Sequence, residues 1–370
     1  MEHNQIATRL RLALEREAAK HVISPGAWPQ IERRFRRQRW RRSGIAAVCV
    51  AVIVAAGIAA PYLWHAISGP AASHPRPRPA PPLAVVSRTH LSHGGSFPAA
   101  GYGAIWVTGE GVIYRVDPAT AQIVTTIAIP GIGLKQSHIA TGAGAVWATG
   151  RDRGRFGVYR IDPRRNRVTA FIRLPPTPVV ITVAYGQVWV NEPRAGPAVV
   201  FRIDPRANRV SGPPIRVGTG GGWMVAGFGA LWVTNGDSNG SVSRINPATG
   251  TVTRTLTNIP DVTAAGAGSL WGTGNYGGIY RVDPATGRVT ATIGRPKNAV
   301  NVTFWAGSAW VSAEPPGTLI RVDPASNRIA GTAVPAGTSP IYITSAPNGL
   351  WVVDFTAGDL LHLAPASAVK

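Results

Sequence analysis

The chain has 370 residues, of which 38 are Lys or Arg and 17 are Asp or Glu, so its formal net charge is +21. Its one cysteine, Cys49, excludes a disulfide within the chain and a zinc site built from thiolates. The basic residues lie on both sides of a long apolar segment, and no helix-turn-helix pattern accompanies them. We therefore expect no nucleic-acid partner, in spite of the high charge.

Residues 1–43 form a basic tail ahead of the apolar segment. Hydrophobic periodicity predicts two short helices in this tail, over residues 6–22 and 29–42. Residues 31–42 contain seven arginines and one glutamate. Because this stretch directly precedes a candidate membrane span, we expect it to bind anionic lipid of the cytoplasmic membrane, with about 1 kcal/mol from each basic residue near the surface.

Residues 44–64 contain no charged side chain, and a helix of this length crosses about 30 Å of hydrocarbon. The arginines before this segment predict, by the positive-inside rule, a cytoplasmic N-terminus and an extracytoplasmic remainder. A cleaved signal peptide is the alternative, but its charged region would be 43 residues long and its apolar core would exceed the usual length of about 7 to 15 residues. We expect a single-pass anchor in the cytoplasmic membrane.

Residues 65–82 form a linker that contains six prolines. Proline-rich chains favour the extended polyproline II conformation, with about 3 Å per residue. We therefore expect a semi-rigid stalk that holds the following domain, residues 83–370, away from the membrane.

A unit of 39 to 43 residues recurs through residues 83–370, and a tryptophan marks its register. Each unit holds four short runs that favour strands and are bounded by Gly, Pro, Asn or Asp. The third run recurs as Tyr-Arg-Val-Asp-Pro or a close variant. The tryptophans in register are Trp106, Trp147, Trp189, Trp232, Trp271, Trp310 and Trp351. This repeat predicts an all-β fold, a seven-bladed β-propeller of four-stranded blades, which follows the transmembrane helix and the short helical cytoplasmic tail.

The last repeat ends without a fourth strand, whereas residues 83–91 form a lone strand candidate ahead of the first repeat. The two observations complement each other. We expect residues 83–91 to complete the seventh blade as its outer strand, which closes the ring without an open sheet edge.

The repeated tryptophan and the Arg-x-Asp pair of the third strand, for example Arg281 and Asp283, recur too regularly to form a single site. Residues two apart in a strand share a face. We expect the arginine and the aspartate to pair between blades, and the tryptophan to fill the core between them.

Polar side chains gather in the loops that follow each tryptophan and in the loops between repeats. These loops lie at one end of a propeller, where the channel mouth is the usual pocket. The candidate ligand-binding residues are Lys135, His138, Arg153, Asn191, Glu192, Asn235, Asp237, Asn275, Tyr276 and Asp354. The pattern predicts neither a metal site nor a cofactor.

The repeats combine Trp-Val-Thr or Trp-Val-Asn, Tyr-Arg-Ile-Asp-Pro, and a Gly-x-Gly turn before the next tryptophan. In these motifs residues 83–366 resemble the streptogramin B lyase (virginiamycin B lyase) family and its YVTN-type seven-bladed relatives. The resemblance to the lyases implies magnesium-assisted elimination that opens a cyclic depsipeptide ester, with a His and Glu cluster at the channel mouth. The family's Trp-x-x-Glu occurs once here, from Trp189 to Glu192, and His138 is the candidate base.

From these patterns we expect a membrane-anchored, extracytoplasmic propeller that binds or scaffolds a ligand or a protein and that could serve as a sensor. The alternative is a magnesium-dependent lyase of the streptogramin type. In that case His138 and Glu192 are the candidate catalytic residues, and magnesium is the cofactor.

Overall fold

The computed structural model describes residues 82–134, 137–175, 179–192, 196–236, 240–273, 278–294, 296, 298–315 and 317–366. The predicted cytoplasmic tail, the predicted membrane span and nearly all of the linker, residues 1–81, lie outside the described residues. Within the described part of the chain, no helix is long and apolar enough to cross a membrane.

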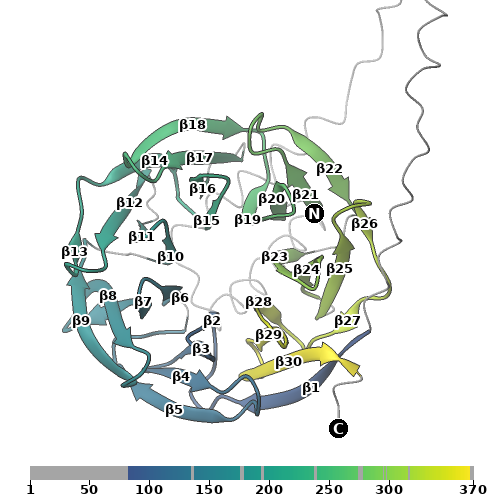
Figure 1. Ribbon diagram of the computed structural model, residues 1–370, viewed down its shortest axis with the longest axis horizontal. Helices are drawn as coiled ribbons and strands as arrows, with labels where there is room; N and C mark the ends of the chain where they lie inside the picture. The colour runs from purple at the N-terminus through teal and green to yellow at the C-terminus, as the bar shows by residue number, and fades with distance from the viewer. Residues whose placement is uncertain are drawn as a thin grey trace, which may run out of the picture. The chain divides into compact units, whose positions relative to one another are not determined.

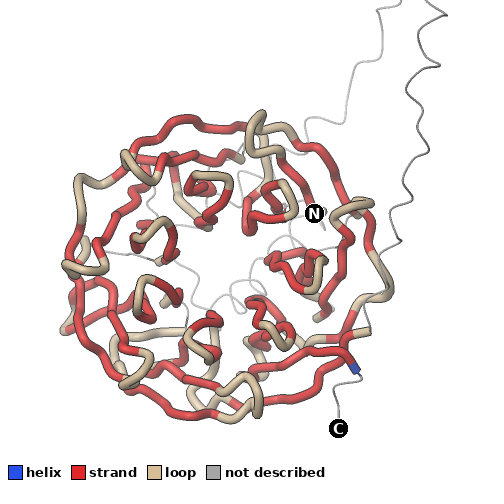
Figure 2. The backbone as a smooth tube through the Cα atoms, viewed as in Figure 1, coloured by secondary structure: helices blue, strands red, loops and turns tan. Residues whose placement is uncertain are grey.

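The described residues form seven antiparallel sheets, which are arranged as blades around a central axis (Figure 1). Each blade runs from an inner strand near the axis to an outer strand at the rim (Figure 2). Blade 1 comprises β2 (Pro98–Gly101), β3 (Ala104–Gly109), β4 (Val112–Val116) and β5 (Ile123–Ala128). Blade 2 comprises β6 (Ile139–Gly142), β7 (Ala145–Asp152), β8 (Arg155–Asp162) and β9 (Arg167–Arg173). The predicted all-β propeller is confirmed.

In blades 3 and 6 the outer strand is split into two short segments that pair with the same third strand. Blade 3 comprises β10 (Val180–Ala184), β11 (Gln187–Glu192), β12 (Pro197–Asp204), β13 (Arg209–Val210) and β14 (Ile215–Thr219). Blade 4 comprises β15 (Met224–Gly227), β16 (Ala230–Asn235), β17 (Ser241–Asn246) and β18 (Thr251–Thr257). Blade 5 comprises β19 (Asp261–Gly266), β20 (Ser269–Thr273), β21 (Ile279–Val282) and β22 (Val289–Ile293). Blade 6 comprises β23 (Ala299–Trp305), β24 (Ser308–Ala313), β25 (Thr318–Asp323), β26 (Arg328–Ile329) and β27 (Val334–Pro335).

Blade 7 is built from both ends of the described chain. It comprises β28 (Pro340–Ala346), β29 (Gly349–Asp354), β30 (Asp359–Pro365) and β1 (Leu83–His90). β1 pairs with β30 along its length, from Leu83 opposite Pro365 to His90 opposite Asp359. Arg88 and His90 both contact the Asp359 carboxylate, at 2.8 and 3.0 Å. The predicted closure of the ring by residues 83–91 is therefore confirmed.

The core lies between neighbouring blades, because a sheet in a propeller buries both of its faces. The second strands are accordingly buried throughout in several blades, as in β3, β16, β24 and β29, whereas the outer strand β18 is mostly exposed. All seven repeated tryptophans lie on second strands and are at most 3% exposed. In blades 1 to 5 each indole Nε1 donates a hydrogen bond of 3.0 Å to the carbonyl five residues earlier.

The expected pairing of arginine with aspartate between blades is wrong. The aspartate accepts hydrogen bonds from the backbone of its own turn, as Asp162 does from the amide of Arg164 at 2.8 Å. The arginine lies over the tryptophan of its own blade, as Arg160 does at 5.4 Å from Trp147, and donates to the asparagine of the next blade's turn. Strand periodicity placed the two residues on one face but did not specify their partners, and an aspartate at a strand end can bond the following amides instead.

The two ends of the ring differ in their loops. We call the end that carries the Asp-Pro-x-x-Gly/Asn turns and the tight turns before each tryptophan the turn end. There, Tyr102 and Gly103 have φ values of 53° and 70°, as the type I′ turn of a two-residue hairpin requires. The opposite end, which carries the loops after each tryptophan and the loops between blades, is the variable end. The turn end repeats closely from blade to blade, so unlike side chains are found mainly at the variable end.

Candidate functional site

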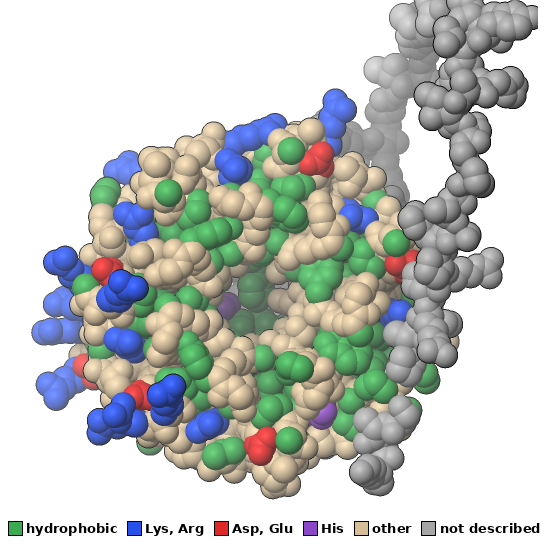
Figure 3. Space-filling view, viewed as in Figure 1, with side chains coloured by type: hydrophobic (Ala, Val, Ile, Leu, Met, Phe, Trp, Pro, Cys, Tyr) green, Lys and Arg blue, Asp and Glu red, His purple; other side chains and the backbone are tan. Residues whose placement is uncertain are grey.

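Four aromatic side chains from four blades meet at the variable end of the central channel. Phe97 and His138 directly precede the inner strands β2 and β6, Trp223 precedes β15, and Tyr342 lies in β28. The ring centroids of Phe97 lie 3.4 Å from His138 and 3.9 Å from Tyr342. Trp223 closes the group, 5.7 Å from His138 and 6.2 Å from Tyr342. Figure 3 shows a hollow at the centre of the ring with hydrophobic side chains at its floor.

Backbone hydrogen bonds hold these aromatic residues at the heads of their strands. The amide of Phe97 donates to the Thr108 hydroxyl at 3.1 Å, and the amide of His138 donates to the Thr149 hydroxyl at 2.9 Å. Each threonine stands two residues after the repeated tryptophan of its blade. The repeat itself therefore positions the cluster.

The aromatic surroundings keep His138 neutral. Burial lowers the pKa of His138 to about 3, because the charged imidazolium loses its hydration. Burial, together with the charge of Glu314, raises the pKa of Tyr342 to about 12. Near neutral pH the cluster is thus an uncharged surface suited to stacking and apolar contacts rather than to proton transfer.

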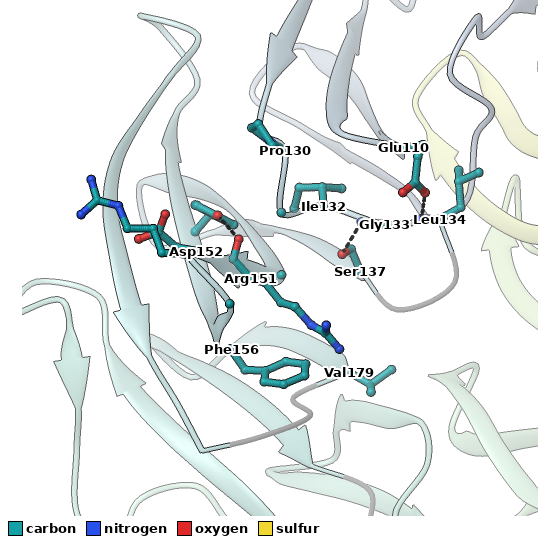
Figure 4. Close-up of a pocket in the computed structure, with 15 residues that line it drawn as sticks. Glu110, Pro130, Ile132, Gly133, Leu134, Ser137, Arg151, Asp152, Phe156 and Val179 are labelled. Atoms are coloured by element: carbon teal, nitrogen blue, oxygen red, sulfur yellow. Dashed lines mark hydrogen bonds between the residues drawn. The ribbon is translucent and has the colours of Figure 1, made fainter. Parts of the chain in front are cut away.

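A pocket of about 750 Å³ lies beside this cluster, between blades 1 and 2 (Figure 4). The loop after β5 forms one wall, and the long hairpin of β7 and β8 forms the other. The two strands of this hairpin pair as far as Asp152 opposite Arg155, and the hairpin ends in a turn at Arg153 and Gly154, with φ values of 48° and 77°. Ser137 lines the pocket while its neighbour His138 belongs to the aromatic cluster, so the two features adjoin.

Close backbone contact joins the two walls of the pocket. The amide of Arg151 donates to the carbonyl of Gly131 at 2.8 Å. A side chain at Gly131 would collide with the backbone of Arg151, because its Cβ would lie 1.5 Å from that carbonyl oxygen. The Tyr159 hydroxyl also donates to the carbonyl of Arg151. Burial, and then the charge of Asp152, raises the pKa of Tyr159, so this phenol remains a donor.

Positively and negatively charged side chains line the pocket, together with an apolar wall. The guanidinium of Arg151 lies 4.1 Å from the ring centroid of Phe156 and extends across the pocket towards Val179 (Figure 4). Among the described residues, no group accepts a hydrogen bond from this guanidinium. On the opposite wall, Glu110 accepts a hydrogen bond of 3.1 Å from the amide of Leu134. A stacked arginine keeps its N–H groups directed in its own plane, where they suit a carboxylate or phosphate.

The structure places Asn191 in the framework between blades. Its amide donates to the carbonyl of Gly222 in the next blade at 2.7 Å, and the side chain is fully buried. Other blades use a hydroxyl at the same repeat position, as Thr149 does towards Val179 at 3.0 Å and Thr234 towards Val262 at 3.2 Å. The Oδ1 of Asn191 is buried and has no partner among the described residues.

Three predicted residues occupy one further repeat position, three residues after the tryptophan. Asn235 accepts a hydrogen bond from the amide of Gly218 at 3.1 Å, and Asp354 accepts from the amides of Thr338 and Ser339 at 2.9 and 3.0 Å. Asn235 therefore bonds the outer strand β14 of blade 3, whereas Asp354 fastens the loop before its own blade. Glu192 lies at the same position of blade 3 and is 2% exposed.

The structure brings only some of the predicted residues together. His138 and Arg153 flank the pocket region on blade 2, whereas Asn191 and Glu192 lie in blade 3, Asn235 in blade 4 and Asp354 in blade 7. The other candidates, Lys135, Asp237, Asn275 and Tyr276, lie outside the described residues. The predicted set therefore spreads around the variable end, and one part of it adjoins the pocket.

Sequence reasoning missed Phe97, Trp223 and Tyr342, which complete the aromatic cluster. One signal was available for Trp223, because it falls outside the register of the seven repeated tryptophans and follows three glycines. Gly220 and Gly221 adopt φ values of 85° and 45°, which a side chain resists. Phe97 and Tyr342 gave no such signal, since their approach depends on the closed ring.

The resemblance found in the sequence implies a magnesium ion, so we asked whether the described residues fit one. Among them, no group of three or more His, Cys, Asp or Glu side chains could hold a metal ion. His138 is stacked against Phe97, and Glu192 is buried at the end of β11. The described residues do not fit a magnesium site, and we derive no magnesium-dependent step.

Comparisons with known proteins agree with a repeat propeller. Residues 202–339 match a family described as a repeat of unknown function (DUF6923). No curated protein matches the sequence. Hydrazine synthase of Kuenenia stuttgartiensis is similar in structure, with 13% identity, a TM-score of 0.61, and coverage of 76% of this chain and 98% of that chain. A chain in the crystal structure of a mitotic checkpoint complex has 11% identity and a TM-score of 0.62, with coverage of 83% and 98%. At these identities the likeness shows the fold alone.

Proposed function

We propose that this chain is a membrane-anchored, extracytoplasmic propeller that binds a ligand at its variable end. The anchor rests on residues 44–64, and the orientation rests on the arginines of residues 31–42, which would also contact anionic lipid. The linker, residues 65–82, would hold the propeller away from the bilayer. A propeller provides a rigid frame on which unlike loops form a binding site.

One observation carries the choice of site. The pocket between blades 1 and 2 has a volume of about 750 Å³, within the range of about 300 to 1,000 Å³ that small-molecule sites occupy. The guanidinium of Arg151, fixed over Phe156, faces this pocket beside the apolar side chains of Ile132 and Val179. This combination suits a ligand with an acidic group and an apolar body, such as an acidic peptide with an aromatic or aliphatic residue.

A binding experiment tests this site. The purified full-length chain in detergent is mixed with labelled hexapeptides that are acidic or basic but otherwise alike. We expect the acidic peptides to bind more tightly and Arg151→Gln to weaken that binding about tenfold, since a hydrogen bond to a charged group contributes about 1.5 to 3 kcal/mol. Arg288→Gln, at an exposed arginine of blade 5, is the matched control and should leave binding unchanged. Equal binding of both peptide classes would refute the proposed chemistry.

The lyase alternative has less support from the geometry. A histidine whose pKa is about 3 is a weak proton acceptor at neutral pH. We expect a type B streptogramin to remain intact, by mass spectrometry, after incubation with the full-length chain and magnesium. Ring opening that requires magnesium and is lost in both His138→Ala and Glu192→Ala would instead establish the lyase.

Reporter fusions test the membrane orientation independently. A reporter enzyme that is active only outside the cytoplasm should be active when fused after Lys370 and inactive when fused at Glu2. A reporter active only in the cytoplasm should give the opposite result. If the fusions at Glu2 and after Lys370 both reported the same side of the membrane, the single-pass anchor would be refuted.

A further inference from the structure

The positive charge of the propeller is concentrated in two neighbouring blades. Residues 139–219, which contain blades 2 and 3, hold 13 arginines and four acidic residues, whereas the remainder of residues 83–370 holds 12 basic and nine acidic residues. Figure 3 shows basic side chains gathered along the rim over β8, β9 and β13, at the left of the view. Most of the excess positive charge therefore lies on one side of the ring.

Six of these arginines form a regular array on the outer rim. The turn between the third and the outer strand carries one arginine, two residues after its aspartate. The outer strand adds an arginine opposite that aspartate and another opposite the residue five positions before it. These positions form a turn row (Arg164 and Arg206), a middle row (Arg167 and Arg209) and a far row (Arg173 and Arg216), and all six side chains are exposed. We call this array the arginine rim.

Two of the three rows are found only in blades 2 and 3. The turn row is alanine at the equivalent positions of blades 1, 4, 5 and 6. The far row is replaced by Ala128, Thr257 and Pro335 in blades 1, 4 and 6. The middle row recurs as Arg288 and Arg328 in blades 5 and 6. A position that serves the packing of a repeat recurs from blade to blade, so the packing of the repeat does not account for the turn row and the far row.

The guanidinium groups of the arginine rim have no fixed partner in the part of the chain that the structure describes. The one salt bridge of blades 2 and 3 among the described residues uses a different arginine, Arg165, which contacts Asp162 at 2.8 Å. The charge of Asp204 attracts Arg206, but its carboxylate accepts hydrogen bonds from the amides of Arg206 and Ala207 in its own turn, at 2.8 and 3.3 Å. The side-chain donors of the rim are therefore directed to solvent.

Outer-strand arginines of other blades are used within the fold. Arg88 of β1 contacts the Asp359 carboxylate at 2.8 Å. Arg254 of β18 donates to the carbonyls of Ala285 and Thr286 in the next blade, at 2.7 and 2.9 Å. The arginine rim lacks such contacts, and its like charges repel one another. An anion bound across the rim would offset this repulsion.

The geometry of the rim favours a long and flexible anion. The middle and far rows lie six residues apart in β9, which is about 20 Å along a strand, and the array continues onto the next blade of a round rim (Figure 2). A flat bilayer would contact only part of this convex surface. The one aromatic side chain of β9, β13 and β14, Phe171, is half-buried against Tyr159. Nucleic-acid bases would therefore find no exposed ring in these strands on which to stack.

We propose that the arginine rim binds a linear anionic polysaccharide whose carboxylate groups contact guanidinium groups of both blades. A guanidinium is always charged, and its planar donors match a carboxylate. The choice of a polysaccharide rests on the extracytoplasmic location proposed above, whereas the array of positive charge does not. None of the six arginines lines the pocket between blades 1 and 2, so the rim and the pocket are separate sites.

A titration with labelled oligogalacturonate, followed by fluorescence anisotropy, tests this proposal on the purified full-length chain in detergent. We expect Arg167→Gln/Arg209→Gln to weaken binding about three- to tenfold, because each exposed ion pair contributes modestly. Arg288→Gln/Arg328→Gln removes the same charge at the middle-row position of blades 5 and 6 and should leave the affinity unchanged. The basic tail, residues 1–43, is the same in every variant, so a difference between the variants reports on the rim.

The far row and the probe provide further tests. Arg173→Gln/Arg216→Gln should weaken binding about as much as the middle-row change, and the uncharged methyl ester of the oligogalacturonate should not bind. An equal loss in the control of blades 5 and 6, or binding that neither rim variant weakens, would overturn the proposal. Tighter binding of single-stranded DNA of equal charge, with the same loss in the rim variants, would overturn it in favour of nucleic acid. These outcomes do not depend on the reporter fusions or on Arg151, so the rim and the proposed function can fail separately.

Discussion

The ordinary junctions between blades and the closing blade solve the same packing problem with different residues. At the junction of blades 2 and 3, Arg160 stacks on Trp147 and reaches Asn208 of the next turn. In blade 7 the counterpart of the arginine is His362, which stacks on Trp351 with ring centroids 4.2 Å apart and an angle of 4°. The imidazole is too short to reach the next blade, and Asn348 makes that contact instead, with the carbonyl of Pro118 at 2.6 Å.

The comparison teaches where a repeat fold gains surfaces of its own. A packing arrangement that recurs in every blade serves stability, and a local departure either has a substitute or leaves a gap. The junction of blades 7 and 1 has its substitute in His362 and Asn348. At the junction of blades 6 and 7 no turn joins β30 to β1, and a pocket of about 930 Å³ lies there, lined by residues 82–83 and by blade 6. We therefore expect changes in the closing blade and changes at the ordinary junctions to lower the stability of the protein by different amounts.

Removal of the closing strand should have the largest effect. Deleting residues 83–91 from the full-length chain exposes the edge of β30 and removes the buried Leu83 and Leu91. The two leucines alone account for about 3 to 6 kcal/mol of burial free energy, and an open edge favours aggregation. We expect a melting temperature lower by more than about 10 °C, or aggregation, in circular dichroism and light scattering. Deleting residues 66–74, a linker segment of the same length, should change neither; equal melting of both deletions would contradict the closure.

Loss of the tryptophan hydrogen bond should have the second-largest effect on stability. Trp147→Phe leaves the carbonyl of Gly142 without its donor, whereas Trp310→Phe breaks no hydrogen bond among the described residues. Both substitutions create a similar cavity, so their difference isolates the hydrogen bond, about 1 kcal/mol. We expect urea unfolding to show a larger loss of stability for Trp147→Phe. An equal loss would mean that the Trp310 indole makes a bond of its own.

The fold could be predicted from the sequence because its stabilising contacts recur. Seven tryptophans at a spacing of 39 to 43 residues and a lone strand ahead of the first repeat were sufficient to predict seven blades and their closure. The partners of Arg160 and Asp162 were not predictable in this way. Strand periodicity assigns a residue to a face, whereas the choice between a neighbouring blade and the residue's own turn depends on the geometry of the junction.

The candidate site was predictable only in part. His138 and Arg153 were recognised as polar residues in unlike loops, and the structure places both near the pocket of blades 1 and 2. Asn235 and Asp354 gave the same signal, yet the structure shows Asn235 hydrogen-bonded to strand β14 of blade 3 and Asp354 to the loop before its own blade. A polar residue three positions after the tryptophan thus has a framework role that a single sequence does not distinguish from ligand binding. Cavities carry no such sequence signal, because they depend on how loops from separate blades meet in the closed ring.

The contact between arginine and asparagine at an ordinary junction should have an effect similar in size to that of the tryptophan bond. Arg160→Leu and Asn208→Leu each remove one partner of a part-buried hydrogen bond of 2.9 Å. We expect a double-mutant cycle in urea unfolding to give a coupling energy of about 0.5 to 1.5 kcal/mol. A cycle between Arg321 and Asn208, which lie in blades 6 and 3, is the control and should give about zero. Zero coupling in the first cycle would show that the junction is held by apolar packing alone.

The smallest effect should come from the charge of a turn aspartate. Hydrogen bonds from Arg165, through its side chain and its amide, and from the amide of Arg164 lower the pKa of Asp162 to about 2. The folded state therefore favours the ionised carboxylate, and the stabilisation is present above the unfolded pKa of about 4 and lost as the pH falls towards 2. Asn246 in blade 4 caps the equivalent turn without a charge, through the amide of Ala248 at 2.9 Å.

Asp162→Asn should consequently retain the cap and lose only its charge. We expect its melting temperature to lie about 1 to 2 °C below that of the unmodified chain at pH 6, and the difference to become much smaller near pH 2, since about half of the Asp162 carboxylates are then protonated. Asn246→Asp reverses the change and should raise the melting temperature slightly at pH 6 but not at pH 2. A difference for Asp162→Asn that is the same at both pH values would show that the turn depends on the shape of the side chain rather than on its charge. In that case the shape of the turn would stabilise the ordinary blades. The closing blade lacks this turn, and its stability would instead depend on the pairing of β1 with β30.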